Sequence, residues 1–600
     1  MILTALNDYY ARLSKANNNE IPSLGYASAP ISYALVLNKS GELVDVEDLR
    51  DTSTKKPKAR YFNVPHSGAR TSGIAPNLFW DKTSYVLGVS LTSKRSTEEH
   101  DSFISYHLDL LQGCDDVGLL AFSSFIKGWN PEDFETNDVF RSIGESLVDT
   151  NLIFRLDIDL CYLHERKAAK TFIVKLLSSN ETSEKNICLV TGELEITERV
   201  HTPIKGVNGA QTAGASIVSF NQNSFESFGK KQGDNSPVGD KAVFSYTTAL
   251  NYLLRRDASN RQRLQLGDAT VVFWAQADTE KTAATAENLF AAFIDPDTED
   301  AQETEKLKRA LETVRQGRPL TDLDKELTDD IKIFVLGLAP NAARLSIRFW
   351  QAGTLNDFAK RLAQHYEDLR IVPLPWKTPP AIWQLLLTTA PMRQGKAKSE
   401  DIPPHLAGEI TRAILTGNSY PYSLLSNLLM RLRADGEVTG LRVALIKAVI
   451  TRFNRLNKNA KFKGEMPVSL DTLNTQPGYL LGRLFSVLER IQQDALGGNV
   501  NATIRDRYYG AASATPAYIF PVLLRNTQNH LGRIRKDKPG MAVNREKIIG
   551  EIIDNLDASF PKSLRMEAQG QFALGYYQQR QVFFIKKETS ELESIQEGEE

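Results

Sequence analysis

The sequence predicts an α+β fold, with a mixed N-terminal α/β region of antiparallel strands followed by a C-terminal helical bundle. Short runs rich in β-branched and aromatic residues, separated by polar turns, occupy the first 278 residues. Beyond residue 380, apolar residues recur instead at i, i+3 and i+4, the spacing of bundle helices. Prolines within 371–380 and 399–408 separate the two patterns, because proline lacks the amide donor that strands and helices need.

The first region opens with a helix and a hairpin. Apolar residues at helical spacing predict an amphipathic helix over residues 2–13. Residues 30–51 read as strand, Lys-Ser-Gly-Glu turn and strand, which predicts a β-hairpin. The remaining strands are expected at 84–91, 152–163, 170–177, 186–195 and 269–276, with a helix at 103–111.

The second half becomes increasingly helical. Residues 280–330 predict acidic helices, and residues 332–369 predict strand, loop, strand and helix. Further helices are expected at 423–435, 440–456, 478–496 and 544–561. The chain is too long for one core, since single cores stop growing beyond roughly 250 to 300 residues. The expected parts are an α+β domain (1–278), an acidic helical and α/β connection (279–380), a helical region (381–465), a basic helical bundle (466–587) and a disordered acidic tail (588–600).

Composition excludes several classes of protein. Lys and Arg total 72 against 73 Asp and Glu, so the overall charge indicates no partner. The three cysteines form no Cys-x-x-Cys pair, which argues against a disulfide framework and a cysteine-based zinc site. A reducing compartment, the cytoplasm, is therefore expected. The sequence contains neither a signal peptide nor a run of about 18 apolar residues, so no membrane association is expected.

Motifs for enzymatic chemistry are weak. Residues 206–214 lack the Gly-Lys-Ser/Thr ending of a P-loop, and the eight histidines show no metal-binding spacing. Asp157 and Asp159 alternate along a predicted strand, where paired carboxylates could bind a divalent metal. The favoured interpretation makes them an acidic surface or partners for Arg155 and Arg166. We therefore expect no catalytic residue, cofactor or metal.

Two polar segments carry residue types suited to nucleic acid. In residues 66–88, small residues allow close approach of the backbone, while Arg70 and Asn77 supply donors. Phe79 and Trp80 in the same segment are expected to pack in the core, with strand separation as the alternative role.

The second polar segment, residues 207–254, combines glycines, amides, phenylalanines and cations. Gln211 and Asn221 suit base edges, and Lys230 and Lys231 suit phosphates. A polar loop whose aromatic residues are tucked into the core explains both segments equally well.

The C-terminal helices are basic. Residues 466–587 contain 16 Lys and Arg against 10 Asp and Glu, whereas the tail contains six Glu. Such a bundle suits a groove for a nucleic-acid backbone, with solvated helix faces as the alternative. The candidate contacts are Arg505, Arg507, Arg533, Arg535 and Lys536.

Taken together, these segments resemble the large subunit of the type I-C CRISPR surveillance complex (Cascade). The similarity runs through residues 1–13, 32–52, 70–88 and 216–254 and continues in helical character to the C-terminus. The resemblance implies a non-catalytic protein that recognises the protospacer-adjacent motif in duplex DNA and promotes R-loop formation. Its implied partners are crRNA, target double-stranded DNA, the backbone and crRNA-processing subunits, and a helicase-nuclease.

Within this resemblance, the candidate site residues take separate roles. Asn77, Gln211 and Asn221 are expected to contact bases by their amides. Arg70, Lys230 and Lys231 are expected to contact phosphates or the groove.

The resemblance also implies that a small subunit is made by internal initiation, for which Met466 is the candidate start. The alternatives are a stand-alone metal-dependent nuclease using Asp157 and Asp159, or a helical scaffold that contacts no nucleic acid.

Overall fold

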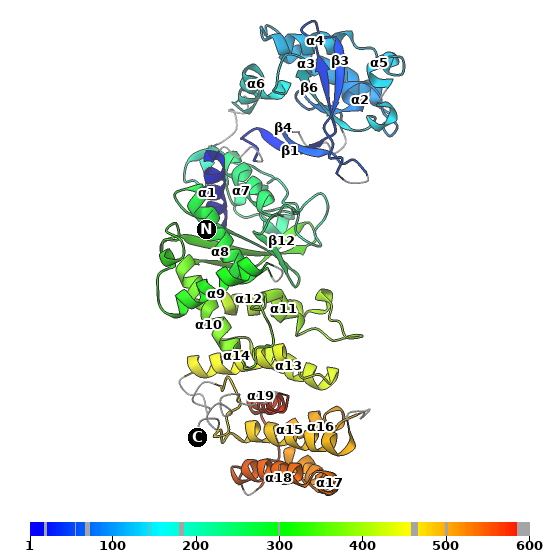
Figure 1. Ribbon diagram of the computed structural model, residues 1–600. Coiled ribbons are helices and arrows are strands. Elements are labelled where there is room, and N and C mark those ends of the chain that lie inside the picture. Colours follow the sequence, from blue (N-terminus) through cyan, green and yellow to red (C-terminus); the bar gives the residue numbers. More distant parts are fainter. Residues whose placement is uncertain are drawn as a thin grey trace, which may run out of the picture. The chain divides into compact units, whose positions relative to one another are not determined.

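The computed structural model divides the chain into two compact units (Figure 1). One unit consists of Met1–Ile204 and Val218–Tyr252, and the other of Lys205–Ile217 and Leu253–Glu600. The structure describes residues 1–16, 21–53, 56–66, 73–141, 143–178, 185–257, 259–297, 300–457, 466–497, 502–557 and 559–584. Arg70 and the predicted tail at 588–600 lie outside the described residues.

The first unit combines short strands with helices. Its strands are β1 (Tyr26–Ile31), β2 (Tyr33–Leu37), β3 (Leu43–Asp48), β4 (Arg60–Pro65), β5 (Asp81–Lys82), β6 (Asn151–Leu156), β7 (Lys185–Ile187) and β8 (Leu194–Ile196). Its helices are α1 (Ile2–Lys15), α2 (Thr83–Val86), α3 (Ser96–Leu110), α4 (Val117–Gly128), α5 (Asp138–Arg141), α6 (Lys167–Ser178) and α7 (Asp240–Leu253).

A four-stranded sheet in the order β3-β2-β6-β5 organises this unit. The predicted hairpin is confirmed as the antiparallel pair β2–β3, while β2 and β6 run parallel. One sheet face is covered by α4, where the rings of Phe122 and Phe154 are 4.8 Å apart. On the other face, Ile153 packs with residues of the β1–β4 ribbon. The sheet therefore has a separate core on each face.

Four of the predicted strands differ from the structure. Residues 186–195 were expected as one strand but contain a turn between the short antiparallel strands β7 and β8. Residues 170–177 lie in α6, because Ala169 and Ile173, four residues apart, are both buried on one helical face. Residues 84–91 contain the short buried helix α2 and no strand. Only the first half of 152–163 is a strand, since β6 ends at Leu156.

The second unit contains a sheet followed by a long series of helices. Its strands are β9 (Arg263–Leu266), β10 (Ala269–Gln276), β11 (Lys332–Asn341) and β12 (Arg344–Thr354). The helices up to the proposed internal start are α8 (Glu280–Ile294), α9 (Ala301–Arg315), α10 (Leu355–Leu369), α11 (Ile382–Leu387), α12 (Pro404–Thr416), α13 (Tyr422–Asp435) and α14 (Gly440–Leu456). The later helices are α15 (Pro477–Leu496), α16 (Ile504–Ala514), α17 (Pro516–Asp537), α18 (Pro539–Asp554) and α19 (Met566–Val582).

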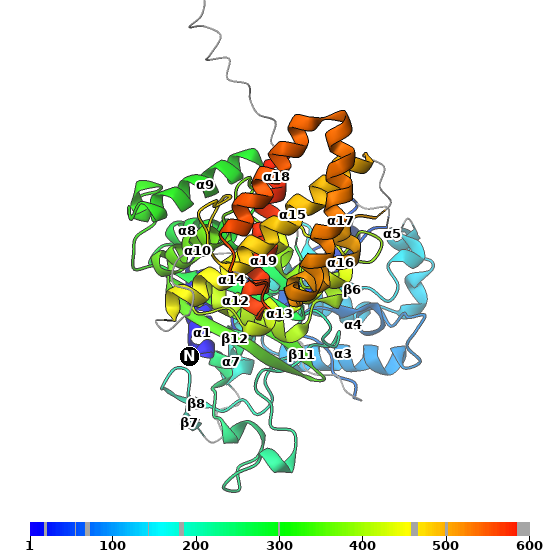
Figure 2. The same ribbon diagram turned by 90° about the horizontal axis from the view of Figure 1, so that it is seen from below.

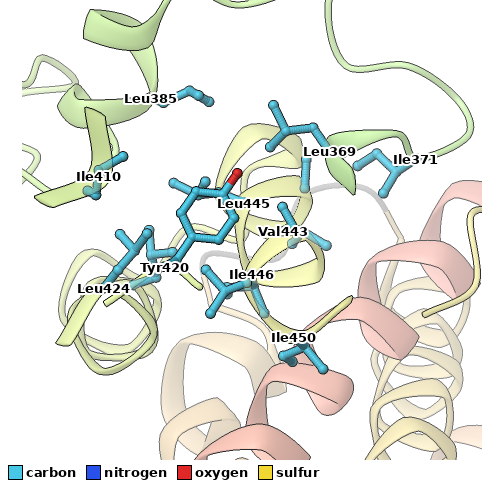
Figure 3. Close-up of a cluster of buried hydrophobic side chains, with 14 of the residues drawn as sticks. Leu369, Ile371, Leu385, Ile410, Tyr420, Leu424, Val443, Leu445, Ile446 and Ile450 are labelled. Atoms are coloured by element: carbon cyan, nitrogen blue, oxygen red, sulfur yellow. The ribbon is translucent and has the colours of Figure 1, made fainter. Parts of the chain in front are cut away.

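The predicted strands and helices of this unit are present, although the helix expected at 544–561 is α18, which begins at Pro539 and ends at Asp554. The antiparallel sheet has the order β12-β11-β10-β9, and β10 has the predicted bounds. Apolar residues from α10 to α14 meet in one buried cluster, whose members include Leu369, Leu424 and Leu445 (Figure 3). A buried ion-pair network also joins α10 to α14: Asp368 accepts bonds from Arg452 Nε at 2.9 Å and Arg455 Nη1 at 2.8 Å.

Helices α15 and α19 pack with almost no space between their backbones. A Cβ atom at Gly482 of α15 would lie 2.1 Å from the carbonyl oxygen of Phe572, and one at Gly575 of α19 would lie 2.2 Å from that of Tyr479. Figure 1 shows α19 between α15 on one side and α13 and α14 on the other. The last described helix of the chain is therefore central to the bundle.

We predict that Gly482→Ala destabilises the bundle, because the added methyl group must displace the backbone of α19. The expected loss is about 1–3 kcal/mol in the free energy of unfolding, measured by urea denaturation. The matched control is Gly550→Ala in α18, where an added Cβ has no atom within 4 Å. This control should gain roughly 0.5–1 kcal/mol from helix propensity. Equal effects of the two substitutions would contradict the close packing.

Several histidines are buried as neutral imidazoles. Burial lowers the pKa of His107 to about 4, although its Nδ1–H donates to the Phe103 carbonyl at 2.8 Å. Desolvation likewise lowers the pKa of His164 and His201 to about 4, and that of His365 to about 3. Protonating any of these side chains in the folded state places a charge where water cannot solvate it.

We predict that acid destabilises the protein well above the range in which carboxylates titrate. Unfolded histidines bind protons below about pH 6.5, whereas the buried ones remain neutral down to about pH 4. Stability is thus complete above pH 6.5 and is lost as the pH falls towards 4. Urea midpoints measured from pH 7.5 to 5 should fall continuously; a flat profile down to pH 5 would contradict these pKa values.

Candidate nucleic-acid interface

The loop at 218–239, between β8 and α7, is anchored at its base. Backbone N–H groups of Leu189 and Glu198 donate to the carbonyls of Pro237 and Val238, at 2.9 and 3.0 Å. Gly233 N–H donates to the Arg199 carbonyl at 3.2 Å. Figure 2 shows this loop beside the β7–β8 hairpin. The loop is thus held by the residues on either side of β8, while its middle projects from the unit.

The tip of the loop is organised by one side chain, that of Asn235. Its Oδ1 accepts the N–H of Ser227 at 2.9 Å, and its Nδ2 donates to the carbonyls of Lys230 and Gln232, both at 3.0 Å. Lys230 N–H closes the turn by donating to the Ser227 carbonyl at 3.0 Å. Phe228, between these residues, adopts φ 53° and is 99% exposed.

The predicted cations of this loop are available to a ligand. Lys230 and Lys231 are exposed, and neither ammonium forms an ion pair with any residue that the structure describes. Asn221 is exposed in the same loop. The loop also contains two carboxylates, the exposed Glu226 and Asp234, and Asp234 is 3.9 Å from the guanidinium of Arg199. The two lysines are therefore exposed neighbours on a formed turn, in a loop whose formal charges balance.

Gln211 belongs to the other unit. Its segment is fixed to the second sheet, because Asn208 N–H donates to Thr270 Oγ1 at 3.0 Å and Ser216 pairs with Arg344. Gln211 is exposed on the turn between these anchors. The structure therefore brings together Asn221, Lys230 and Lys231 in one loop, with Gln211 in a separate element.

The segment around Asn77 is buried, whereas a side chain that contacts a base must be accessible. Asn77 is 5% exposed; its backbone N–H donates to Asp81 Oδ2 at 2.8 Å, and its amide oxygen lacks a partner among the described residues. Contact with a base would require this segment to open, and the role of Asn77 stays a prediction. Phe79 and Trp80 fill the cores on opposite faces of the sheet, as expected for core residues.

The carboxylates at 157 and 159 do not share a strand face, because β6 ends before them. The carboxylate of Asp159 pairs with Arg166, which also holds Asp116 through an Nε–Oδ1 contact of 2.8 Å. Pairing with arginine is the alternative that the sequence favoured for Asp159. Within the described parts of the chain, no group of three or more His, Cys, Asp or Glu side chains is arranged to hold a metal ion.

The predicted cations of the C-terminal bundle fall into two groups. Arg505 lies 3.3 Å from Asp506, and Arg535 lies 2.5 Å from Glu546, so both charges are partly neutralised. Arg507, Arg533 and Lys536 are exposed and form no ion pair with a described residue.

Two of the three unpaired cations, Arg533 and Lys536, lie on α17. Arg533 and Lys536 line an open groove of about 680 Å³ along α17, together with Gln528, Asn529, Gly532 and the acidic Asp537. In Figure 2, α17 runs beside α18, which contacts it. The sequence placed these cations correctly on helices but could not distinguish the paired from the unpaired ones.

Sequence reasoning missed two residues of the loop, Phe228 and Asn235. The exposed ring of Phe228 was treated as one of several phenylalanines that could pack inward. A signal was present: Phe228 is followed by Gly-Lys-Lys-Gln-Gly-Asp-Asn, which offers no apolar neighbour to bury it. The role of Asn235 depends on backbone geometry that the sequence does not reveal.

No helix in the described ranges has the length and apolarity needed to cross a bilayer. Comparison with curated proteins finds no match. A family model described as CRISPR-associated protein (Cas_Csd1) matches residues 6–584, which include elements of both units. This agrees with the family that the sequence resembles. Because the match covers nearly the entire chain, the protein belongs to the Csd1 family of CRISPR-associated proteins.

Proposed function

We propose that this protein is the non-catalytic large subunit of a crRNA-guided type I-C interference complex. In this role it recognises the protospacer-adjacent motif in duplex DNA, promotes R-loop formation and supports recruitment of the helicase-nuclease. Membership of a CRISPR-associated family supports this setting. The observation that carries the DNA-binding role is the anchored loop that holds Lys230 and Lys231 exposed and without acidic partners.

The loop offers two kinds of contact to a duplex. Lysine ammonium groups neutralise phosphates without reading sequence, whereas amides such as that of Asn221 can donate to and accept from base edges. A protein that reads only a short motif needs few base contacts, because the guide RNA reads the remaining target by pairing. Gln211, Asn77 and Arg70 are further candidates for this recognition.

The C-terminal bundle suits the backbone of a single strand. Arg507, Arg533 and Lys536 are its available cations, and the polar groove along α17 provides a path for phosphates. Arg505 and Arg535 are candidates of lower availability, because they already contact carboxylates. We therefore assign the displaced strand to this bundle.

The proposed complex contains crRNA, target double-stranded DNA, and the backbone and crRNA-processing subunits, and it operates in the prokaryotic cytoplasm. A stand-alone nuclease is the less favoured function, since the Asp159 carboxylate is engaged by Arg166. Metal-dependent cleavage by the isolated protein, abolished by Asp157→Asn, would support the nuclease. Absence of DNA binding in the assembled complex would support a scaffold.

We predict that the double substitution Lys230→Ala with Lys231→Ala weakens binding to motif-bearing and motif-free duplexes by similar factors. Each phosphate contact contributes about 0.9 to the slope of log K against log salt, so the slope should fall by roughly 2. Affinity of the assembled complex should be measured at several salt concentrations.

The control pair is Lys39→Ala with Lys127→Ala, which removes the same charge from exposed positions of the same unit. An equal loss in the control pair would attribute the effect to net charge. A loss confined to motif-bearing DNA would mean that the lysines read bases.

Met466 precedes a complete set of helices. Residues 467–476 contain no helix or strand, and α15 begins only at Pro477, so a start at Met466 would leave α15 to α19 whole. Met430 lies inside α13, so a start there would cut a helix. Met541 lies inside α18, and a start there would also omit α15. We propose that internal initiation at Met466 produces the small subunit.

We predict that the unmodified gene yields a second protein of about 15 kDa, a typical size for one domain, with the same C-terminus. Replacing the Met466 codon by Leu should abolish this band on a blot against a C-terminal tag and spare the full-length protein. Met541→Leu is the matched control and should leave both bands. Persistence of the band in Met466→Leu would place the start elsewhere or indicate proteolysis.

A further inference from the structure

Phe228 is an aromatic side chain held outside any core. Its ring is 99% exposed, whereas Phe79 and Trp80, the aromatic residues of the other polar segment, are buried. Its backbone occupies the left-handed region at φ 53°, which is unfavourable for a residue with a Cβ atom. Burial of the Phe228 side chain therefore does not stabilise this backbone conformation.

Asn235 provides the bonds that hold this conformation. Its side chain binds the backbone on both sides of Phe228, through Ser227 and Lys230, and Gly233 in the same short helix (Gln232–Asn235) is bonded to Arg199. The ring is thus presented from a turn connected to the body of the unit. Strained backbone supported in this way is concentrated at functional positions.

The surroundings of the ring favour a nucleobase as its partner. No apolar side chain occurs among residues 226, 227 and 229–232, which include the anion Glu226 and the cations Lys230 and Lys231, whereas protein-binding hot spots are anchors that fill well-packed pockets. An exposed ring followed closely by two cations matches the stacking platforms that bind unpaired bases. Gly229 leaves open space beside the ring, since a Cβ atom there would have no neighbour within 4 Å.

We propose that Phe228 stacks on a base of the target DNA where the duplex begins to open, and that Asn235 is the positioning residue for its ring. This inference rests on the proposed function, because it requires the loop to contact duplex DNA. Lys230 and Lys231 hold the phosphates, while Phe228 replaces a neighbouring base pair in the stack. The aromatic face suits any base, so this contact does not determine the motif.

The test uses the assembled complex with its guide RNA and target duplexes that carry 2-aminopurine at successive positions beside the motif. Phe228→Ala should reduce the rate of fluorescence increase about tenfold or more at one or two adjacent positions, as expected for loss of base stacking. Phe228→Trp should retain it. The salt dependence of binding should not change, because no phosphate contact is removed.

Asn235→Ala tests the positioning role. It should reduce the rate of opening without changing the salt slope, and combined with Phe228→Ala it should cause little further loss. An additive loss in the double variant would refute positioning by Asn235. Unchanged opening in Phe228→Ala, alongside weakened binding in the lysine variant, would refute stacking and leave the proposed function intact.

Two further outcomes would separate the causes of failure. If the lysine variant binds DNA normally, the loop is not a DNA contact, and the stacking inference fails together with the role proposed for the loop. If Phe228→Ala instead prevents assembly with the other subunits, the ring binds protein and the stacking inference is overturned.

Discussion

The close contact between α15 and α19 is the constraint on which the helical half of the protein depends. Glycines let the two backbones touch, and paired polar groups then set their register: Tyr576 donates to Glu489 at 2.6 Å and Tyr479 to Gln578 at 2.5 Å. Helix α19 also packs on α13, α14 and α16. It therefore lies between helices that precede residue 458 in the sequence and helices that follow residue 465. The bundle is therefore complete only when the C-terminal helix is in place.

The candidate interface, the loop at 218–239, is exposed, whereas the helical bundle is tightly packed. Its tip contributes little burial, so the packing of the unit places few constraints on the identity of its side chains. Its base, in contrast, is bonded to Leu189, Glu198 and Arg199, which lie on either side of β8. In the proposed function, this anchoring would limit the conformational entropy lost on binding.

The sequence predicted the fold well where one periodicity dominates, as in β10, the β11–β12 hairpin and α14, whose bounds match or nearly match. It failed in α6, where Thr171, Phe172, Ile173 and Val174 favour a strand but the buried face repeats every four residues. At the candidate site, the composition of residues 207–254 predicted a polar loop, and the structure forms one at 218–239. They could not identify Asn235, because its role depends on three bonds to backbone atoms.

Gly570 of α19 has a consequence for any shorter form of the chain. A Cβ atom there would lie 2.6 Å from Ile450 Cδ1 and 2.9 Å from Ile446 Cγ2, so α19 fits flush against α14. A polypeptide that starts at Met466 contains α19 but not α14, which leaves this apolar strip without its cover. Its solubility would then depend on whichever protein shields the strip. The amount of soluble short chain in a cell would consequently report how much of that protein is present.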